Sequence, residues 1–202
     1  MKIKTIEIHN DGYVFCRSRF YTSHDVWQES TAQFTCGTNK MIGEIDCGNW
    51  AVSYTLSMYK HRLKDFVLFQ SPDVIVNGNS ISISKFNQYS CYLDPINPLF
   101  SSHQTVEKMI CKGIKKSDAK QTAAEIIKLF DLDEQRIKRP LKSTGNEIFR
   151  CMGAIGFAYG KQVFCFPWLS KARYNYFSGQ IQALLDVLES NKMISIVPIG
   201  ES

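Results

Sequence analysis

Two short apolar segments near the end of the chain constrain the fold most. Val163 to Phe166 is entirely apolar, and Met193 to Val197 contains a single serine. Strands without alternating polar residues are typical of a parallel sheet that is covered on both faces. The segment between them has apolar residues at helical spacing and ends near Asn191, and a second helix is predicted from Asn146 to Tyr159, with Gly160 at its end. This helix-strand-helix-strand order predicts an α/β fold.

The first hundred residues favour strands. Lys4 to His9 and Tyr13 to Arg17 flank Asn10-Asp11-Gly12, a composition typical of a hairpin turn. A second turn is predicted at Gly37 to Lys40, with strands on both sides of it, and Asn49 is expected to cap a helix. The other predicted strands are Thr31–Cys36, Met41–Asp46, Phe66–Phe69, Val74–Asn77, Ile81–Ser84 and Tyr89–Leu93.

The middle of the chain is predicted to be helical and carries most of the positive charge. Helices are expected at Gln104 to Lys112 and at Asp118 to Phe130, the second capped by Ser117 or Asp118. Eleven basic and seven acidic residues lie between Glu107 and Arg150, against a net charge of +5 for the whole chain. This surplus is too small for a nucleic-acid-binding surface, and we expect solvated helix faces and no nucleic-acid partner.

The cysteines predict a reducing environment. The chain has seven, an odd number with no C-x-x-C pair, and several of them lie in apolar runs. We therefore expect buried, reduced thiols rather than disulfides or a metal site. The chain shows no signal peptide and no apolar run long enough to span a membrane, so we expect a cytoplasmic protein that reaches a membrane only through a partner.

Several motifs resemble those of the nucleotide-binding domain of ATP-binding cassette (ABC) transporters, in a degraded form. The family's phosphate loop, N-G-A-G-K-S-T-L, resembles Asn49 to Leu56, where Asn49, Ala51, Thr55 and Leu56 agree. The other positions differ, because Trp50 and Val52 replace glycines, Ser53 replaces the lysine and Tyr54 replaces the serine. A phosphate loop needs glycines for close backbone approach and the lysine for charge, so the resemblance implies weak nucleotide binding.

The other motifs are similarly altered. The signature segment is similar to Thr144-Gly145-Asn146-Glu147, and Asp94 stands at the glutamine position of the Q-loop. The Walker B strand resembles Val163 to Phe166 but is followed by Pro167 instead of the metal-binding and catalytic carboxylates, and no switch histidine follows the last strand. The resemblance therefore implies that hydrolysis by the family mechanism is absent, and we expect no cofactor, with weak binding of ATP and magnesium as the alternative.

The resemblance implies one ABC-ATPase-like α/β domain over residues 1–202, with a mixed core sheet. Residues 1–101 would form the antiparallel strands and the phosphate-loop-like unit, 102–150 a helical subdomain, and 151–202 the rest of the core. The expected function is that of a non-catalytic interaction or regulatory subunit. Its partners would be a second copy of the chain, an active ABC ATPase subunit or a membrane permease, and its signature segment could complete the ATP site of an active partner.

Two other functions remain open. A nucleotide-binding ABC ATPase subunit of low affinity would keep the family role. A hydrolase of unrelated chemistry on the same frame would need a nucleophile and a base, yet the four histidines lie in no recognisable nucleophile motif. An unrelated α/β protein, in which the Trp50 region is a buried strand-to-helix turn, is the structural alternative to the whole resemblance.

Overall fold

The computed structural model describes residues 1–17, 24–58, 66–68, 72–117 and 120–201. Its strands form two sheets, one antiparallel with the order β2-β1-β5-β6 and with β4 paired to β1, the other parallel with the order β3-β9-β8-β7. The strands are β1 Thr5–Arg17, β2 His24–Thr35, β3 Gly37–Ile42, β4 Phe66–Leu68, β5 Asp73–Val76, β6 Asn79–Ile81, β7 Ser90–Tyr92, β8 Val163–Cys165 and β9 Ile194–Ile199.

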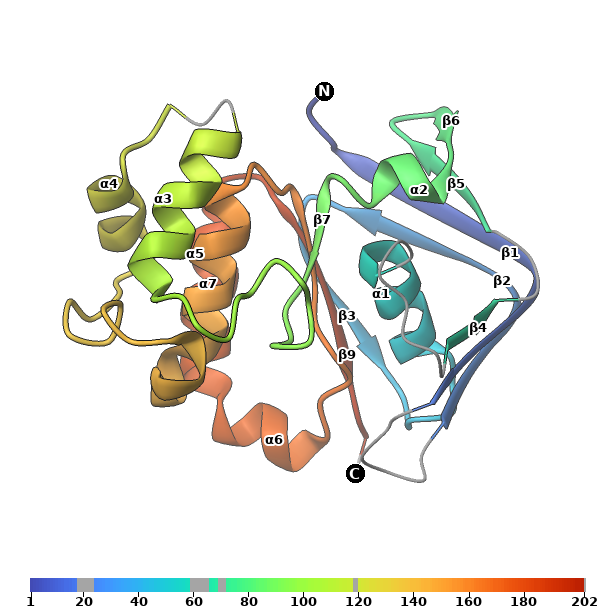
Figure 1. Cartoon of the computed structure of the whole chain (residues 1–202). Coiled ribbons are helices and arrows are strands. Elements are labelled where there is room, and N and C mark those ends of the chain that lie inside the picture. Colours follow the sequence, from blue (N-terminus) through green and yellow to red (C-terminus); the bar gives the residue numbers. More distant parts are fainter. Residues whose placement is uncertain (18–23, 59–65, 69–71, 118–119, 202) are drawn as a thin grey trace.

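Helices cover both faces of the parallel sheet. The helices are α1 Asn49–Met58, α2 Ile83–Phe86, α3 Val106–Lys116, α4 Ala123–Leu129, α5 Ile148–Ala158, α6 Lys171–Tyr176 and α7 Ser178–Ser190, with 3-10 turns η2 Leu141–Ser143 and η3 Gly145–Glu147. Figure 1 shows α1 between the two sheets, and α5 and α7 on the opposite side of the parallel sheet. Among the described residues, no helix is long and apolar enough to cross a membrane.

Helix α1 is buried on every side. All residues from Ala51 to Met58 are buried, because the antiparallel sheet covers one side of the helix and the parallel sheet the other. From Ala51 onward the helix has no face exposed to solvent, and its buried Ser53 and Ser57 hydroxyls donate to backbone carbonyl oxygens. The helix is partly exposed at its first residues, Asn49 and Trp50, and the loop that follows β3 leads into this end of the helix.

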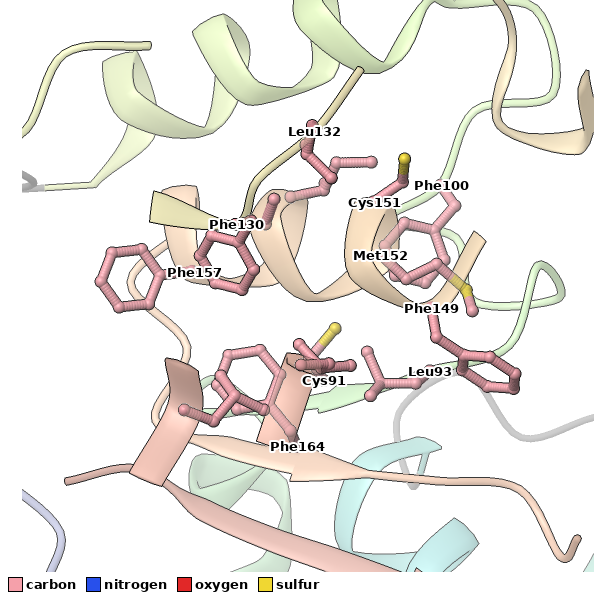
Figure 2. Close-up of a cluster of buried hydrophobic side chains, with 14 of the residues drawn as sticks. Cys91, Leu93, Phe100, Phe130, Leu132, Phe149, Cys151, Met152, Phe157 and Phe164 are labelled. Atoms are coloured by element: carbon pink, nitrogen blue, oxygen red, sulfur yellow. The ribbon is translucent and has the colours of Figure 1, made fainter. Parts of the chain in front are cut away.

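A second core surrounds α5, with side chains on both sides of the helix (Figure 2). There Phe149 stacks on Phe166, and Phe130 contacts Phe157 edge to face. A Cβ atom added to Gly156 would lie 2.9 Å from both Cys91 Sγ and Phe164 Cε1, so the absence of a side chain lets α5 approach the sheet closely. The apolar segments that predicted the parallel sheet are indeed its two buried central strands, β8 and β9.

Several predicted elements in the first hundred residues are wrong. No hairpin forms at Asn10, because β1 continues to Arg17 with a register shift between Asn10 and Tyr13. The predicted turn at Gly37 to Lys40 lies in β3, where only Gly37, at φ 100°, has a turn-like backbone. Asn49 is the first residue of α1 rather than its cap.

The remaining errors concern element boundaries. Of Met41 to Asp46, only Met41 and Ile42 lie in a strand, and of Ile81 to Ser84 only Ile81, since Ser82 caps α2. The predicted strand Thr31–Cys36 is the end of the longer β2, which stops at Thr35. The others shift by a few residues, and Phe69 lies outside the described part of the chain.

Two helices of the middle segment begin later than predicted. Thr105 caps α3, and Thr122 caps α4 in a reciprocal capping box with Glu125. Ser117 is the C-cap of α3, and Asp118 lies outside the described residues. Gly160 follows α5 at φ 71°, as predicted. The division into residues 1–101, 102–150 and 151–202 stays a prediction.

The expectation of buried thiols is correct for part of the chain. Cys91, Cys151 and Cys165 are buried, and burial raises the pKa of each thiol, to about 12 for Cys91 and Cys151. Cys36 and Cys47 are exposed, so the prediction of buried thiols is wrong for these two residues. All the cysteines whose side chains are described are free thiols.

Candidate functional site

The candidate site lies where the parallel strands end and α1 begins. In sheets of this kind, ligands bind outside the carboxyl ends of the strands, and a helix N-terminus there offers backbone N–H groups to an anion. Here β3 ends at Ile42, and residues 43–48 lead directly into α1. The phosphate-loop-like residues therefore occupy the position at which a phosphate-binding loop is expected.

Most of the phosphate-loop-like side chains point into the protein. Ala51, Ser53, Tyr54 and Thr55 are buried, and Asn49 is partly exposed. The Ser53 hydroxyl donates to the Phe166 carbonyl oxygen at 2.5 Å, and this carbonyl directly follows β8. The lysine position of the family motif thus carries a short side chain whose hydroxyl is bonded to the neighbouring strand end.

Aromatic side chains pack beside the loop. Trp50 Nε1 donates to the Tyr92 hydroxyl at 3.0 Å, which joins α1 to the end of β7. Tyr54 contacts Tyr92 edge to face, with the ring centroids 5.3 Å apart. The indole that stands at a glycine position of the family motif is therefore held in place by the protein itself.

The groups that anchor the loop come from β2. The Asp25 carboxylate accepts hydrogen bonds from the backbone N–H of Gly48 through Oδ1 and of Ala51 through Oδ2, both at 2.7 Å. Asp25 is fully buried. The Asp25 carboxylate therefore accepts hydrogen bonds from backbone N–H groups at the start of α1 that could otherwise bind an external anion.

Burial and hydrogen bonding act in opposite directions on Asp25. Burial raises the pKa of its carboxyl group, and backbone hydrogen bonds to Ala51, Gly48, Trp50 and Val26 lower it, so that the pKa is raised overall. Among the described residues, the groups that lower it are all backbone groups. Backbone dipoles thus offset part of the cost of burying the carboxylate charge, and burial remains the larger effect.

Gly48 permits this approach of β2 to the loop. Its φ is 89°, and an added Cβ atom would lie 2.9 Å from the Val26 carbonyl oxygen and 3.0 Å from Trp27 Cα. Both neighbours are backbone atoms and cannot rotate away. No motif in the sequence marks Asp25, because its partners lie more than twenty residues further along the chain.

Asp94 lies on the same edge of the sheet but outside the loop. It follows β7, and its Oδ1 accepts from the Ile96 backbone N–H at 2.9 Å. Burial raises the pKa of the Asp94 carboxyl group, while the charge of Arg173, in α6, lowers it. This residue therefore serves the turn that follows β7 and has an electrostatic partner in α6.

The end of β8 has no carboxylate to offer a metal. After Phe166 and Pro167, the Trp168 indole donates to the Gly43 carbonyl oxygen at 3.3 Å, at the end of β3. Leu169 then bridges to Ile199 of β9. Within the described ranges, no three His, Cys, Asp or Glu side chains are grouped in a way that could hold a metal ion.

The signature-like segment lies on the other side of the parallel sheet, before α5, so it does not meet α1 within the chain (Figure 1). Thr144 is buried and donates to the Leu141 carbonyl oxygen at 2.7 Å. Glu147 is buried against Arg150, with Oε1 to Nη2 at 3.1 Å. Gly145 and Asn146 are exposed. Only two of the four residues therefore face outward.

Comparison with known proteins identifies the fold. No sequence-family model matches the chain, and no match is found among curated proteins. A protein of Pyrococcus furiosus described as an ABC transporter ATP-binding protein has a TM-score of 0.63 at 17% identity, with 98% of this chain and 92% of that chain covered. CbiO1 of Clostridium perfringens, part of the CbiONQ transporter complex, has a TM-score of 0.61 at 15% identity, covering 98% and 79%.

A third solved structure is an ATP-binding cassette in a dimeric post-hydrolysis state with ADP and Pi. Its TM-score is 0.59 at 11% identity, and 98% of this chain and 88% of that chain are covered. At identities this low, the likeness is one of fold. The chain has the mixed α/β fold of ABC ATP-binding domains, as its motifs predicted.

Proposed function

We propose that this chain is a non-catalytic relative of ABC ATP-binding domains that acts by binding other proteins. Its partner would be a second copy, an active ABC ATPase subunit or a membrane permease, and the chain would work at the membrane only through such a partner. Two of the similar structures support a role in an assembly, since one belongs to a transporter complex and the other is a dimer.

The observation that carries this proposal is the occupied loop at the start of α1. The Gly48 and Ala51 N–H groups are bonded to Asp25, and the Ser53 hydroxyl is bonded to the Phe166 carbonyl. A nucleotide phosphate at this place would have to displace a buried carboxylate of the same charge sign. It would also find no lysine at position 53, a charge-assisted contact worth about 1.5 to 3 kcal/mol. Binding of ATP in the family's pose is therefore unfavourable.

Catalysis would lack its other components as well. The Phe166 carbonyl is followed by Pro167 and Trp168, where the family carries a metal-binding and a catalytic carboxylate. Phosphoryl transfer depends on a metal ion and on a group that positions water. We therefore propose that no ATP or magnesium is required for the activity of this chain.

The surface most suited to a partner's ATP site is the exposed part of the signature-like segment. Ser143, Gly145 and Asn146 are exposed, and Gly145 has a φ of 63°, in the left-handed region that favours glycine. Thr144 and Glu147 are engaged inside the protein. A contribution to a partner's site would therefore come from Gly145, Asn146 and nearby backbone groups.

The proposal is tested by measuring assembly and nucleotide dependence together. Light scattering would measure the molar mass of the purified protein over a hundredfold concentration range, with and without Mg-ATP. We expect either a self-association that Mg-ATP does not change or a monomer at all concentrations. For a monomer, affinity purification from cells that naturally produce the chain should recover an ABC ATPase or permease identified by mass spectrometry. A protein that stays monomeric and recovers neither class of partner contradicts the proposal.

A further inference from the structure

The start of α1 is built as an anion-binding site, and its anion belongs to the chain. Asp25 presents both carboxylate oxygens to the loop, one to Gly48 N and one to Ala51 N. Both distances are 2.7 Å, at the short end of the range for N–H donors, as is usual when the acceptor is charged. The carboxylate thus makes the contacts that a phosphate oxygen makes with the backbone of a phosphate-binding loop.

These donors need an anion or another acceptor. The first N–H groups of a helix have no partner inside the helix, and the helix dipole makes this end positive. Gly48 and Ala51 are both buried, so water is poorly placed to satisfy them. In a family phosphate loop, a lysine adds to the positive potential, and here position 53 is a serine bonded elsewhere. Asp25 therefore supplies the acceptor that this helix end requires.

The strand that carries Asp25 is fixed in position. The Asn10 side-chain amide, buried at the register shift of β1, donates to the Trp27 carbonyl oxygen at 2.9 Å. Trp27 is itself buried, with its indole bonded to Ser30. On the loop side, the Cα of Gly48 comes close to Val26 without a Cβ atom between them. The contact between Asp25 and the loop is thus held from both sides.

We infer that the Gly48–Ala51 turn is a working oxyanion cradle whose permanent occupant is the Asp25 carboxylate. The carboxylate keeps the loop ordered without nucleotide, and it excludes external phosphate from the cradle by occupying it. Removal of the Asp25 side chain should therefore create a vacant site for a small oxyanion, either a carboxylate or a phosphate. This inference rests on the proposed function and explains why the loop can persist without a nucleotide.

The test is chemical rescue of an Asp25→Ala variant. Loss of the carboxylate leaves two buried N–H groups without their acceptor, and Tm should fall by about 3 to 10 °C. Sodium formate, or sodium phosphate, should then raise the Tm of the variant in a saturable manner, by about 2 to 5 °C more than it raises that of the wild type. Rescue by formate alone indicates a cradle sized for a carboxylate, and rescue by phosphate indicates one that admits a phosphoryl group.

The matched control is Asp46→Ala, which removes an exposed carboxylate of the same loop. Because phosphate stabilises most proteins weakly by exclusion from their surface, only a saturable excess over wild type and Asp46→Ala counts as binding. Sodium chloride at equal ionic strength controls for screening. Equal, non-saturable shifts in all three proteins would overturn the inference.

A second readout applies if Asp25→Ala does not fold. Burial first, and then the charges of Asp25 and Asp46, raise the pKa of the exposed Cys47 thiol. Asp25→Asn keeps the shape of the side chain and removes its charge, so iodoacetamide should alkylate Cys47 about two- to tenfold faster at pH 8, with Cys36 as the internal reference. An unchanged ratio of the two rates would overturn the inference. Both results are independent of Mg-ATP binding by the wild type, which tests the proposed function.

Discussion

Replacement of Glu147 tests whether the signature-like segment is built for internal packing. Glu147 Oε1 lies 3.1 Å from Arg150 Nη2 and 3.7 Å from Arg136 Nη1, and its other oxygen accepts from the Asp133 backbone N–H. The Glu147 and Arg150 side chains are each only 9% exposed. Arg150 also contacts Asp131, but that carboxylate is 97% exposed and offers a weaker, solvent-screened partner.

Glu147→Ala would leave the buried guanidinium without its main counter-charge. Breaking one half of a buried pair costs about 3 to 5 kcal/mol, which for a chain of this length corresponds to a fall in Tm of about 6 to 20 °C. Arg150 Nη1 would keep its hydrogen bonds to the Asp131 carbonyl oxygen and carboxylate, but Arg150 Nε has no hydrogen-bond partner within the described part of the chain, so compensation would be incomplete. Urea denaturation and differential scanning calorimetry would measure the loss.

Two controls separate the lone charge from general damage. Asn146→Ala removes an exposed side chain that bonds Arg136, and should change the stability by less than about 1 kcal/mol. Glu147→Ala combined with Arg150→Met removes both charges and should recover much of the loss. If Glu147→Ala is no less stable than Asn146→Ala, the segment does not depend on the buried pair and the reasoning is refuted.

Three further predictions concern the loop at the start of α1. Gly48→Ala should lower the free energy of unfolding by about 2 kcal/mol or more, because φ is 89° and the Val26 backbone leaves no room for a Cβ atom; an unchanged urea midpoint would contradict this. Ser53→Lys should not restore ATP binding and should instead destabilise the fold by several kcal/mol, because position 53 is fully buried. Circular dichroism would measure folding and an ATP titration would measure binding. A folded variant that binds ATP would contradict this prediction. Because burial raises the pKa of Asp25 above its unfolded value of about 3.9, stability is highest below that value and falls as the pH rises through the folded pKa, where the buried carboxyl group ionises; Asp25→Asn, which leaves the neighbouring Asp46 and Cys47 in place, should remove this fall from the pH profile of the urea midpoint, and a profile identical to that of the wild type would contradict the prediction.

The parallel core was predictable from local sequence because its strands are uniform. β8 has no polar residue, so burial on both faces followed directly from its composition, and Gly160 marked the end of α5. The antiparallel sheet was harder to predict from local sequence. Asn10-Asp11-Gly12 has the composition of a turn, but long-range pairing with β2 and β5 keeps the strand extended and converts the turn signal into an irregularity of register.

The candidate site was predictable only where it follows a motif. The spacing from Asn49 to Thr55 predicted the position of the loop, and the proposed loss of the family's lysine and carboxylates rests on residue identity alone. Asp25 could not be found in this way, because its role depends on β2 passing within hydrogen-bonding distance of Gly48 in three dimensions. The inward orientation of Glu147 likewise depends on its ion pair with Arg150, and no sequence motif indicates that these two residues pair.

The most direct test of the central claim is isothermal titration calorimetry of Mg-ATP into the wild-type protein. No saturable heat is expected with ATP at millimolar concentration, because Asp25 occupies the backbone donors of the loop and position 53 carries no lysine. A saturable one-to-one isotherm with a Kd in the micromolar range would show that phosphate displaces the carboxylate, and it would contradict the claim that the loop is closed by the protein's own side chain.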